Sequence, residues 1–310
     1  MKQNDAVFAS LESLVKDKYQ TYRLSSIEGK KTRKSNAGDT QSIFKGRGMD
    51  FDEVREYQDG DDVRLVDWRL TAKVGKVYTK IYHEERDRQV WFLLDLRKGM
   101  KFGTKQAFKS VIAAHITAML GWFFSEKGDK IGGIILSDKK MISFNPSRLR
   151  RRIMSFFNTV SEETKKETHF EKQEEEVSLT QACLKLRRTC RNGNIVFIIS
   201  DFSDLDEDTL RCLASVARTN EVTFINVYDI LEGRCPSPNL YVVSDGSSHS
   251  VLDTRHKDIH DAYIYYFQKR LVQIQEFANK YHVRYIPVSS EEDYYDVVAK
   301  SLQKRRKRAL

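Results

Sequence analysis

Two aspartates in this chain each follow a buried apolar run, and carboxylates in that position are candidates for chemistry. Asp95 ends the run VWFLLD, and Asp201 follows the run IVFIIS. In open α/β sheets, ligands bind outside the carboxyl ends of the strands. A divalent cation there needs several oxygen ligands, among them hydroxyl groups close behind the first aspartate. The sequence instead places Arg97, Lys98 and Gly99 behind Asp95. We therefore expect Arg97 or Lys98 to pair with Asp95 or Asp201 in place of a metal ion.

The elements that must position these aspartates alternate between strands and helices from Val90 onward. This alternation predicts an α/β fold with a mostly parallel sheet covered on both faces. Strands are expected at 90–95, 131–136, 195–202, 222–230 and 283–288, with 141–144 as a short hairpin partner, and helices at 105–124, 148–160, 178–190, 206–218, 259–281 and 291–304. In the first of these helices, His115 lies on the apolar face and is expected to be a hydrogen-bonded core residue.

The chain before this alternation has a different pattern. Residues 5–22 carry apolar side chains at helical spacing, which predicts one amphipathic helix. Residues 43–88 are expected to form short strands and turns. The predicted organisation is a helical segment at 1–24, a β-rich region at 25–88, an α/β domain at 89–303 with a hairpin near 239–253, and a basic tail at 304–310.

The β-rich region is dense in charged residues around Trp68. These charges could form a binding surface, or they could form an ion-pair network that holds an irregular β segment, and we favour the network because buried charges are normally paired. Trp68 is expected to pack among them as an apolar anchor. The charged residues are Asp61, Asp62, Arg64, Asp67, Arg69 and Glu84.

Composition excludes several classes of protein. The 310 residues are 40% hydrophobic and 31% charged, with a net charge of +9, which is typical of a globular protein. No apolar run approaches the roughly 20 residues of a membrane helix, and the N-terminus lacks the apolar core of a signal peptide. The four cysteines show no CxxC spacing, and Cys183 and Cys190 are expected to be small core residues. These features predict a cytoplasmic protein.

The positive charge gathers in short clusters that leave three kinds of partner open. Such clusters can bind nucleic acid, anionic lipid or an acidic protein, or they can be solvated surface, which we favour. Aromatic residues do not interleave with the basic runs, so binding to single-stranded nucleic acid is disfavoured. The clusters lie at 30–34, 148–152 and 304–308.

Known catalytic and nucleotide-binding motifs do not occur in the sequence. It contains no GxGxxG, GxxxxGK[ST], GxSxG or HExxH pattern. His256 and His260 have helical i, i+4 spacing but lack a third candidate zinc ligand. A metal-dependent hydrolase built on Asp95 and Asp201 is disfavoured because nothing supplies a base or nucleophile. We therefore expect no cofactor and no enzymatic activity.

Several longer segments resemble one bacterial family. They are GRGMDFDEVREYQDGDDVRLVDWRLTAKVGKVYTKIYHEE, DLRKGMKFGTKQAFKSV, WFFSEKGDKIGGIIL, FIISDF and VYDILEGRCPSPNLYVVSDG. The chain resembles domain-of-unknown-function family 58 over roughly residues 20–300. This resemblance implies a three-layer, von Willebrand A-like (Rossmann-like) domain with an N-terminal β-rich elaboration, and an association with MoxR-type AAA+ ATPases.

The resemblance also implies where a metal-ion-dependent adhesion site would lie. Its usual pattern is Asp-x-Ser-x-Ser, then a Thr or Ser on a second loop and an Asp on a third. Asp95 matches the first aspartate, but Arg97 and Gly99 replace the two serines. Ser178 or Thr180 could stand on the second loop, and Asp201 matches the third with Ser203 beside it. No metal is expected, and if one bound, its ligands would be Asp95, Thr180 and Asp201. The expected binding rim consists of Asp95, Arg97, Lys98, Ser178, Asp201 and Ser203.

The function implied by the resemblance is that of a non-enzymatic protein-interaction component. It would act with a MoxR-type AAA+ ATPase in chaperone-like assembly or maturation of client proteins, with Arg97 and Lys98 contacting an acidic residue of the partner. The alternative is a basic module that binds nucleic acid or an anionic membrane surface. Peripheral contact with an anionic membrane remains open, whereas no specific nucleic acid and no transmembrane segment are expected.

Overall fold

The computed structural model describes residues 6–24, 50–58, 63–83, 88–166, 176–244 and 249–303. The chain divides into two compact units, one formed by Met1–Asn36 with Arg88–Leu310 and the other by Ala37–Asp87. The larger unit carries both Asp95 and Asp201.

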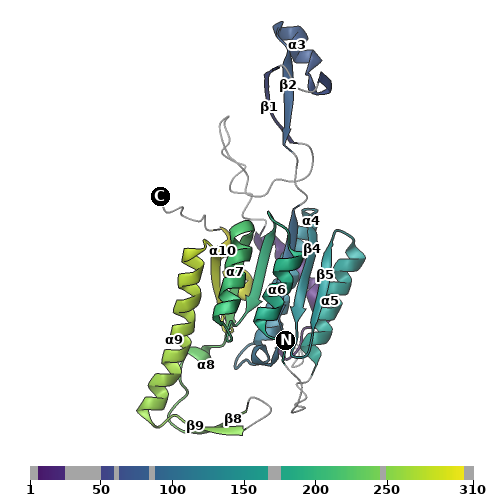
Figure 1. Ribbon diagram of the computed structural model, residues 1–310. Helices are drawn as coiled ribbons and strands as arrows, with labels where there is room; N and C mark the ends of the chain where they lie inside the picture. Colours follow the sequence, from purple (N-terminus) through teal and green to yellow (C-terminus); the bar gives the residue numbers. More distant parts are fainter. Residues whose placement is uncertain are drawn as a thin grey trace. The chain divides into compact units, whose positions relative to one another are not determined.

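The larger unit is built on a six-stranded sheet with the order β10-β7-β6-β3-β4-β5 (Figure 1). Every neighbouring pair is parallel except β4 with β5, so the predicted mostly parallel sheet is confirmed. The order reverses direction between β3 and β6, and this switch point is where such sheets bind ligands. The strands are β3 (Gln89–Asp95), β4 (Lys130–Leu136), β5 (Met141–Ser147), β6 (Ile195–Ser200), β7 (Glu221–Tyr228) and β10 (Arg284–Ser289).

Helices cover both faces of this sheet and complete a three-layer, Rossmann-like fold (Figure 1). One face carries α6 (Leu179–Thr189), α7 (Glu207–Thr219) and α9 (Lys257–Lys280). The other face carries α4 (Lys109–Glu126), which contacts α1 (Leu11–Lys16), α5 (Arg150–Lys165) and α10 (Tyr294–Gln303). Along the chain, β7 is followed by the short helix α8 (Ile230–Gly233) and by a hairpin of β8 (Leu240–Ser244) and β9 (His249–Asp253), and then by α9.

The central strand β3 shows why the sequence folds in layers. Successive side chains of a strand point to opposite faces, so a strand that is buried on both sides is apolar throughout. Trp91 and Leu93 belong to the core under α6 and α7. Phe92 points the other way, where it stacks with Phe156 of α5. Both faces of β3 are therefore filled, and only its carboxyl end is left for polar chemistry.

The N-terminal segment is not the single helix predicted for residues 5–22. Helix α1 ends at Lys16, and a 3-10 helix, η2 (Asp17–Thr21), follows it. Asp17 is buried, with its carboxylate 2.7 Å from Nδ1 of His115 and within hydrogen-bonding distance of the Tyr295 hydroxyl. These contacts anchor the tighter turn, and they confirm that His115 is a hydrogen-bonded core residue. Tyr22, the last residue of the predicted helix, is exposed.

The smaller unit contains an antiparallel pair, β1 (Asp50–Glu56) and β2 (Tyr78–His83). Between them lie a 3-10 turn, η3 (Val63–Leu65), and a helix that was not predicted, α3 (Trp68–Val74). Asp67 caps α3 by accepting hydrogen bonds from the backbone N–H groups of Arg69 and Leu70, and Gly75 ends it at a φ of 79°, which suits glycine.

The expected role of Trp68 as an apolar anchor is wrong. Its side chain begins α3 and is 64% exposed, and α3 buries none of its own residues. Of the charged residues around it, Asp67 serves as the helix cap, whereas Asp61, Asp62 and Glu84 lie outside the described residues. The role of Asp67 is therefore to cap the N-terminus of α3.

Candidate functional site

The two aspartates singled out from the sequence lie at neighbouring strand ends. Asp95 is the last residue of β3, and Asp201 directly follows β6. Because β3 and β6 are adjacent and parallel, both carboxylates reach the carboxyl edge of the sheet at the switch point. Both are buried, and Asp95 is only 1% exposed. A buried carboxylate requires a compensating partner.

The partner of Asp95 is Arg97. Nε of Arg97 lies 2.9 Å from Oδ1 of Asp95 and Nη2 lies 2.7 Å from Oδ2, so the contact is bidentate. The Ser200 hydroxyl also donates to Oδ2 at 2.8 Å. On its other side the guanidinium donates to both carboxylate oxygens of Asp204, with Nη2 2.9 Å from Oδ1. The pairing of Arg97 with Asp95 is therefore confirmed.

The expectation that Arg97 contacts a partner protein directly needs correction. All three guanidinium nitrogens donate hydrogen bonds within the chain, and the side chain is 15% exposed. A partner carboxylate would have to displace Asp95 or Asp204 to reach it. Lys98 is placed differently, because its Nζ lies 2.5 Å from Glu176 and its backbone N–H donates to Asp138. Lys98 is therefore oriented toward the outer part of the rim.

Asp201 has its own cation, Lys109, which the sequence reasoning missed. Nζ of Lys109 lies 2.8 Å from Oδ2 of Asp201 and 2.7 Å from Oε1 of Glu232. Glu232 in turn accepts a hydrogen bond from Arg270 at 2.6 Å. The signal was a lysine at the first position of α4, whose next fifteen residues are all buried. A charged side chain at the start of such a buried helix needs a polar partner, and here that partner is Asp201 at the end of β6.

Burial and pairing act against each other on these groups. Burial disfavours the charge on Lys109, but Asp201 and Glu232 outweigh it and raise the pKa of Lys109. Burial would raise the pKa of Asp201, but the Lys109 ammonium outweighs it and lowers that pKa. For Asp95, burial outweighs the hydrogen bonds from Arg97, and the nearby charge of Asp201 adds to it, so its pKa is raised. The two aspartates thus belong to different electrostatic environments at one edge.

The hydroxyl groups of Ser178 and Thr180, the two candidates for the second loop, are engaged in local structure. Ser178 is the N-cap of α6 and forms a capping box with Gln181. The Thr180 hydroxyl lies 2.6 Å from that of Thr209 and also contacts Asp206. Ser203 is exposed, and its backbone N–H donates to Asp201 at 3.0 Å. Of these three residues, Ser203 is the one that forms a hydrogen bond with an aspartate of the site.

The donor set at this edge does not fit a divalent cation. Such an ion needs oxygen ligands around one point, whereas Oδ2 of Asp95 and Oδ2 of Asp201 each lie within 2.8 Å of a cationic nitrogen of the chain. Thr180, the third ligand considered from the sequence, bonds elsewhere. Across the described residues, no group of three or more His, Cys, Asp or Glu side chains is arranged to hold a metal ion.

A third buried carboxylate fixes the loop that follows β3. Asp229 accepts hydrogen bonds from the backbone N–H and the hydroxyl of Thr104, at 2.9 and 2.8 Å, and from Ser290 at 2.7 Å. The loop also requires Gly103, because a Cβ there would lie 2.2 Å from the carbonyl oxygen of Ala107. The carboxyl edge is therefore a preformed surface.

Comparison with known proteins identifies the family. Residues 53–269 match the family model described as "Protein of unknown function DUF58". The chain belongs to this family. It is 26% identical over 211 residues to uncharacterized proteins of Mycobacterium bovis and Mycobacterium tuberculosis, a match that covers 68% of this chain and 65% of each relative. The chain thus spans somewhat less than two thirds of the length of these relatives.

One solved structure similar to this DUF58 chain is that of an aerotolerance-related membrane protein from Bacteroides fragilis with multiple mutations to serines. The identity is 13% and the TM-score 0.42, with 69% of this chain and 96% of that chain covered. A likeness this weak carries no argument about function. None of the described helices combines the length and apolar composition needed to cross a bilayer.

Proposed function

We propose that this DUF58 protein is a non-enzymatic protein-interaction component that works with a MoxR-type AAA+ ATPase in chaperone-like assembly or maturation of other proteins. The choice of ATPase rests on the family resemblance of the sequence. We favour binding over catalysis because Asp95 and Asp201 are neutralised by Arg97 and Lys109 of the same chain.

This neutralisation argues against catalysis at the switch point. A catalytic acid, base or metal must reach a substrate atom. Asp95 accepts four hydrogen bonds from Arg97 and Ser200, and Lys109 is shared by two carboxylates. Neither aspartate is therefore available as a base or a metal ligand without breaking a buried ion pair, which typically costs about 3–5 kcal/mol.

The same edge suits a protein partner, in the manner of von Willebrand A-like domains. Lys98 of the rim pairs with Glu176, and Lys105, in the loop that follows β3, pairs with Glu291. All four side chains are at least partly exposed, and surface pairs contribute about 0–1 kcal/mol. Acidic side chains of a partner can exchange with Glu176 and Glu291 at little cost. The buried pairs beneath them keep the rim in one conformation, which reduces the ordering cost of binding.

Capture from cells of the native bacterium tests the proposal. The tagged chain is used as bait with ATP under conditions that block hydrolysis, and again without nucleotide, and captured proteins are identified by mass spectrometry. We expect a MoxR-type ATPase to be enriched when hydrolysis is blocked. Capture of no such ATPase in either condition, with the bait folded by circular dichroism, would contradict the proposal.

A further inference from the structure

A basic surface lies at the end of the larger unit where α4 finishes, away from the aspartates. Helix α4 starts beside Asp201 and runs for 18 residues, which is about 27 Å. We call the surface formed by η2, the end of α4 and the start of α5 the basic face. Its basic side chains are Lys18, Lys127, Arg148, Arg150, Arg151 and Arg152.

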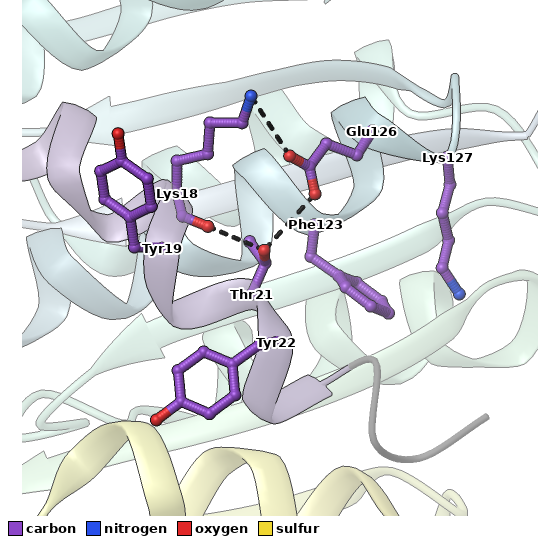
Figure 2. A pocket seen from close by; sticks show the side chains of 7 residues that line it. All are labelled: Lys18, Tyr19, Thr21, Tyr22, Phe123, Glu126 and Lys127. Carbon is purple, nitrogen blue, oxygen red and sulfur yellow. Dashed lines mark hydrogen bonds and ion pairs between the residues drawn. The ribbon is translucent and has the colours of Figure 1, made fainter. Parts of the chain in front are cut away.

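Contacts in the structure show that these three segments form one continuous surface. Lys18 and Thr21 of η2 both reach Glu126 at the end of α4, at 3.5 and 3.4 Å (Figure 2). Nε of Arg148 donates to the carbonyl oxygen of Gly128 at 2.6 Å. The guanidinium of Arg150 lies 5.7 Å from the ring centroid of Trp122. Residues separated by more than a hundred positions are thus brought together.

The charge of the basic face is not explained by helix stability. Arg150, Arg151 and Arg152 are exposed and form no ion pair with any residue that the structure describes. They occupy the first turn of α5, which contains no acidic residue. Basic side chains at a helix N-terminus are slightly unfavourable because of the helix dipole. Their presence there favours a role in binding an anionic partner.

Large apolar side chains are exposed among these charges. Tyr19, Tyr22 and Leu149 are 76%, 61% and 56% exposed. Tyr19 and Tyr22 line an open cleft of about 460 Å³. Figure 2 shows Phe123 and Lys127 across from them. The sequence showed no aromatic residues within the basic runs, but the fold places Tyr19 and Tyr22 around the same cleft as Lys18 and Lys127.

We propose that the basic face binds the surface of a bilayer containing anionic phospholipids. Lysine and arginine are attracted to the negative headgroups, and tyrosine is enriched where headgroups meet acyl chains. Leu149, an exposed aliphatic side chain flanked by arginines, suits insertion into that boundary and has no counterpart in binding single-stranded nucleic acid, which uses stacking. This inference does not depend on the proposed partnership with an ATPase.

Two variants of the full chain separate the charge from the apolar contribution. The first is Arg150→Gln with Arg151→Gln and Arg152→Gln. Each basic side chain strengthens binding about fivefold, so the loss of all three should weaken binding about 100-fold. The matched control neutralises three exposed basic residues of α6, on the other face of the sheet: Lys185→Gln, Arg187→Gln and Arg188→Gln. The second variant is Leu149→Ser, which leaves a better N-cap for α5 and removes the aliphatic contact.

Sedimentation with vesicles provides the measurement. Vesicles of phosphatidylcholine alone are compared with vesicles that also contain phosphatidylglycerol, and a labelled single-stranded oligonucleotide is tested in parallel. We expect binding to the anionic vesicles only, weakened about 100-fold by the triple variant of α5, several-fold by Leu149→Ser, and much less by the α6 control. The same ranking should hold in a chain shortened by residues 304–310.

Three results would overturn the proposal. One is no binding to anionic vesicles at low salt by the folded wild-type chain. The second is equal weakening by the α5 and α6 variants, which would show only a response to net charge. The third is binding to the oligonucleotide but not to the vesicles, lost with the α5 arginines, which would make the basic face a nucleic-acid surface.

Discussion

Removing Lys109 should strongly destabilise the fold, because it leaves a carboxylate buried without its cation. In Lys109→Met, Glu232 keeps its hydrogen bond from Arg270, whereas Asp201 loses its direct ion pair and keeps the neutral N–H of Ser203 as a donor. The side chains of Lys109 and Asp201 are both buried. Loss of one partner of such a pair typically costs about 3–5 kcal/mol, a large part of the roughly 5–15 kcal/mol that stabilises a typical domain.

Urea unfolding followed by circular dichroism measures this cost. The control is Lys105→Met, which removes a neighbouring lysine whose side chain is 63% exposed and pairs with Glu291. The control should lose less than about 1 kcal/mol. The double variant Lys109→Met with Asp201→Asn should recover much of the stability, because it removes the unpaired charge as well.

The stability deficit of Lys109→Met should depend on pH in a characteristic direction. In the wild type, Lys109 lowers the pKa of Asp201. Its contribution to stability is therefore complete above the unfolded pKa of about 3.9 and is lost as pH falls through the lower folded pKa. Without Lys109, burial raises the pKa of Asp201, so the deficit of the variant should shrink as the pH is lowered from 7 toward 4. A loss at pH 7 no larger than that of Lys105→Met would refute the reasoning.

Three further predictions concern the rest of the molecule. Arg97→Lys should lower the melting temperature almost as much as Arg97→Ala, because a lysine cannot reproduce the bidentate contact with Asp95; full stability in Arg97→Lys would contradict it. Calorimetric titration with Mg²⁺ or Mn²⁺ should give no saturable binding, and micromolar binding abolished by Asp95→Ala would show that a metal site exists. Cys190, whose pKa burial raises to about 11, should stay unmodified by a thiol reagent in the native protein, whereas the partly exposed Cys235 should react; equal rates would indicate that the core opens.

The parts of this structure that could be predicted from sequence depend on short-range patterns. Apolar runs of strand length gave β3 and β6, and the positions of Asp95 and Asp201 followed from the ends of those runs. The pairing of Arg97 with Asp95 was accessible because the two residues are only two positions apart. Cys183 and Cys190 were expected to be small core residues, and both are buried.

The parts that could not be predicted depend on contacts between distant elements. Lys109 and Asp201 are 92 positions apart, and only the packing of α4 against the sheet brings them together. Asp17 and His115 are 98 positions apart, and their contact accounts for the tight turn after α1. Trp68 was misjudged because a large apolar side chain usually packs inside, and no local pattern reveals that α3 buries none of its residues.

The affinity between this chain and a purified MoxR-type ATPase tests the central claim most directly. The chain is immobilised, and the dissociation constant is measured for the wild type, for Lys98→Glu with Lys105→Glu, and for the control Arg187→Glu with Arg188→Glu on α6. Both exchanges reverse two positive charges. Lys105, Arg187 and Arg188 are exposed and Lys98 is partly exposed, and thermal unfolding confirms that each variant is folded. We expect the wild type to bind and the control to change little. We expect the rim variant to bind at least tenfold more weakly, which corresponds to about 1.4 kcal/mol or more. No binding by the wild type, or equal affinity for the rim variant, would contradict the claim that the carboxyl edge of the sheet is the partner surface.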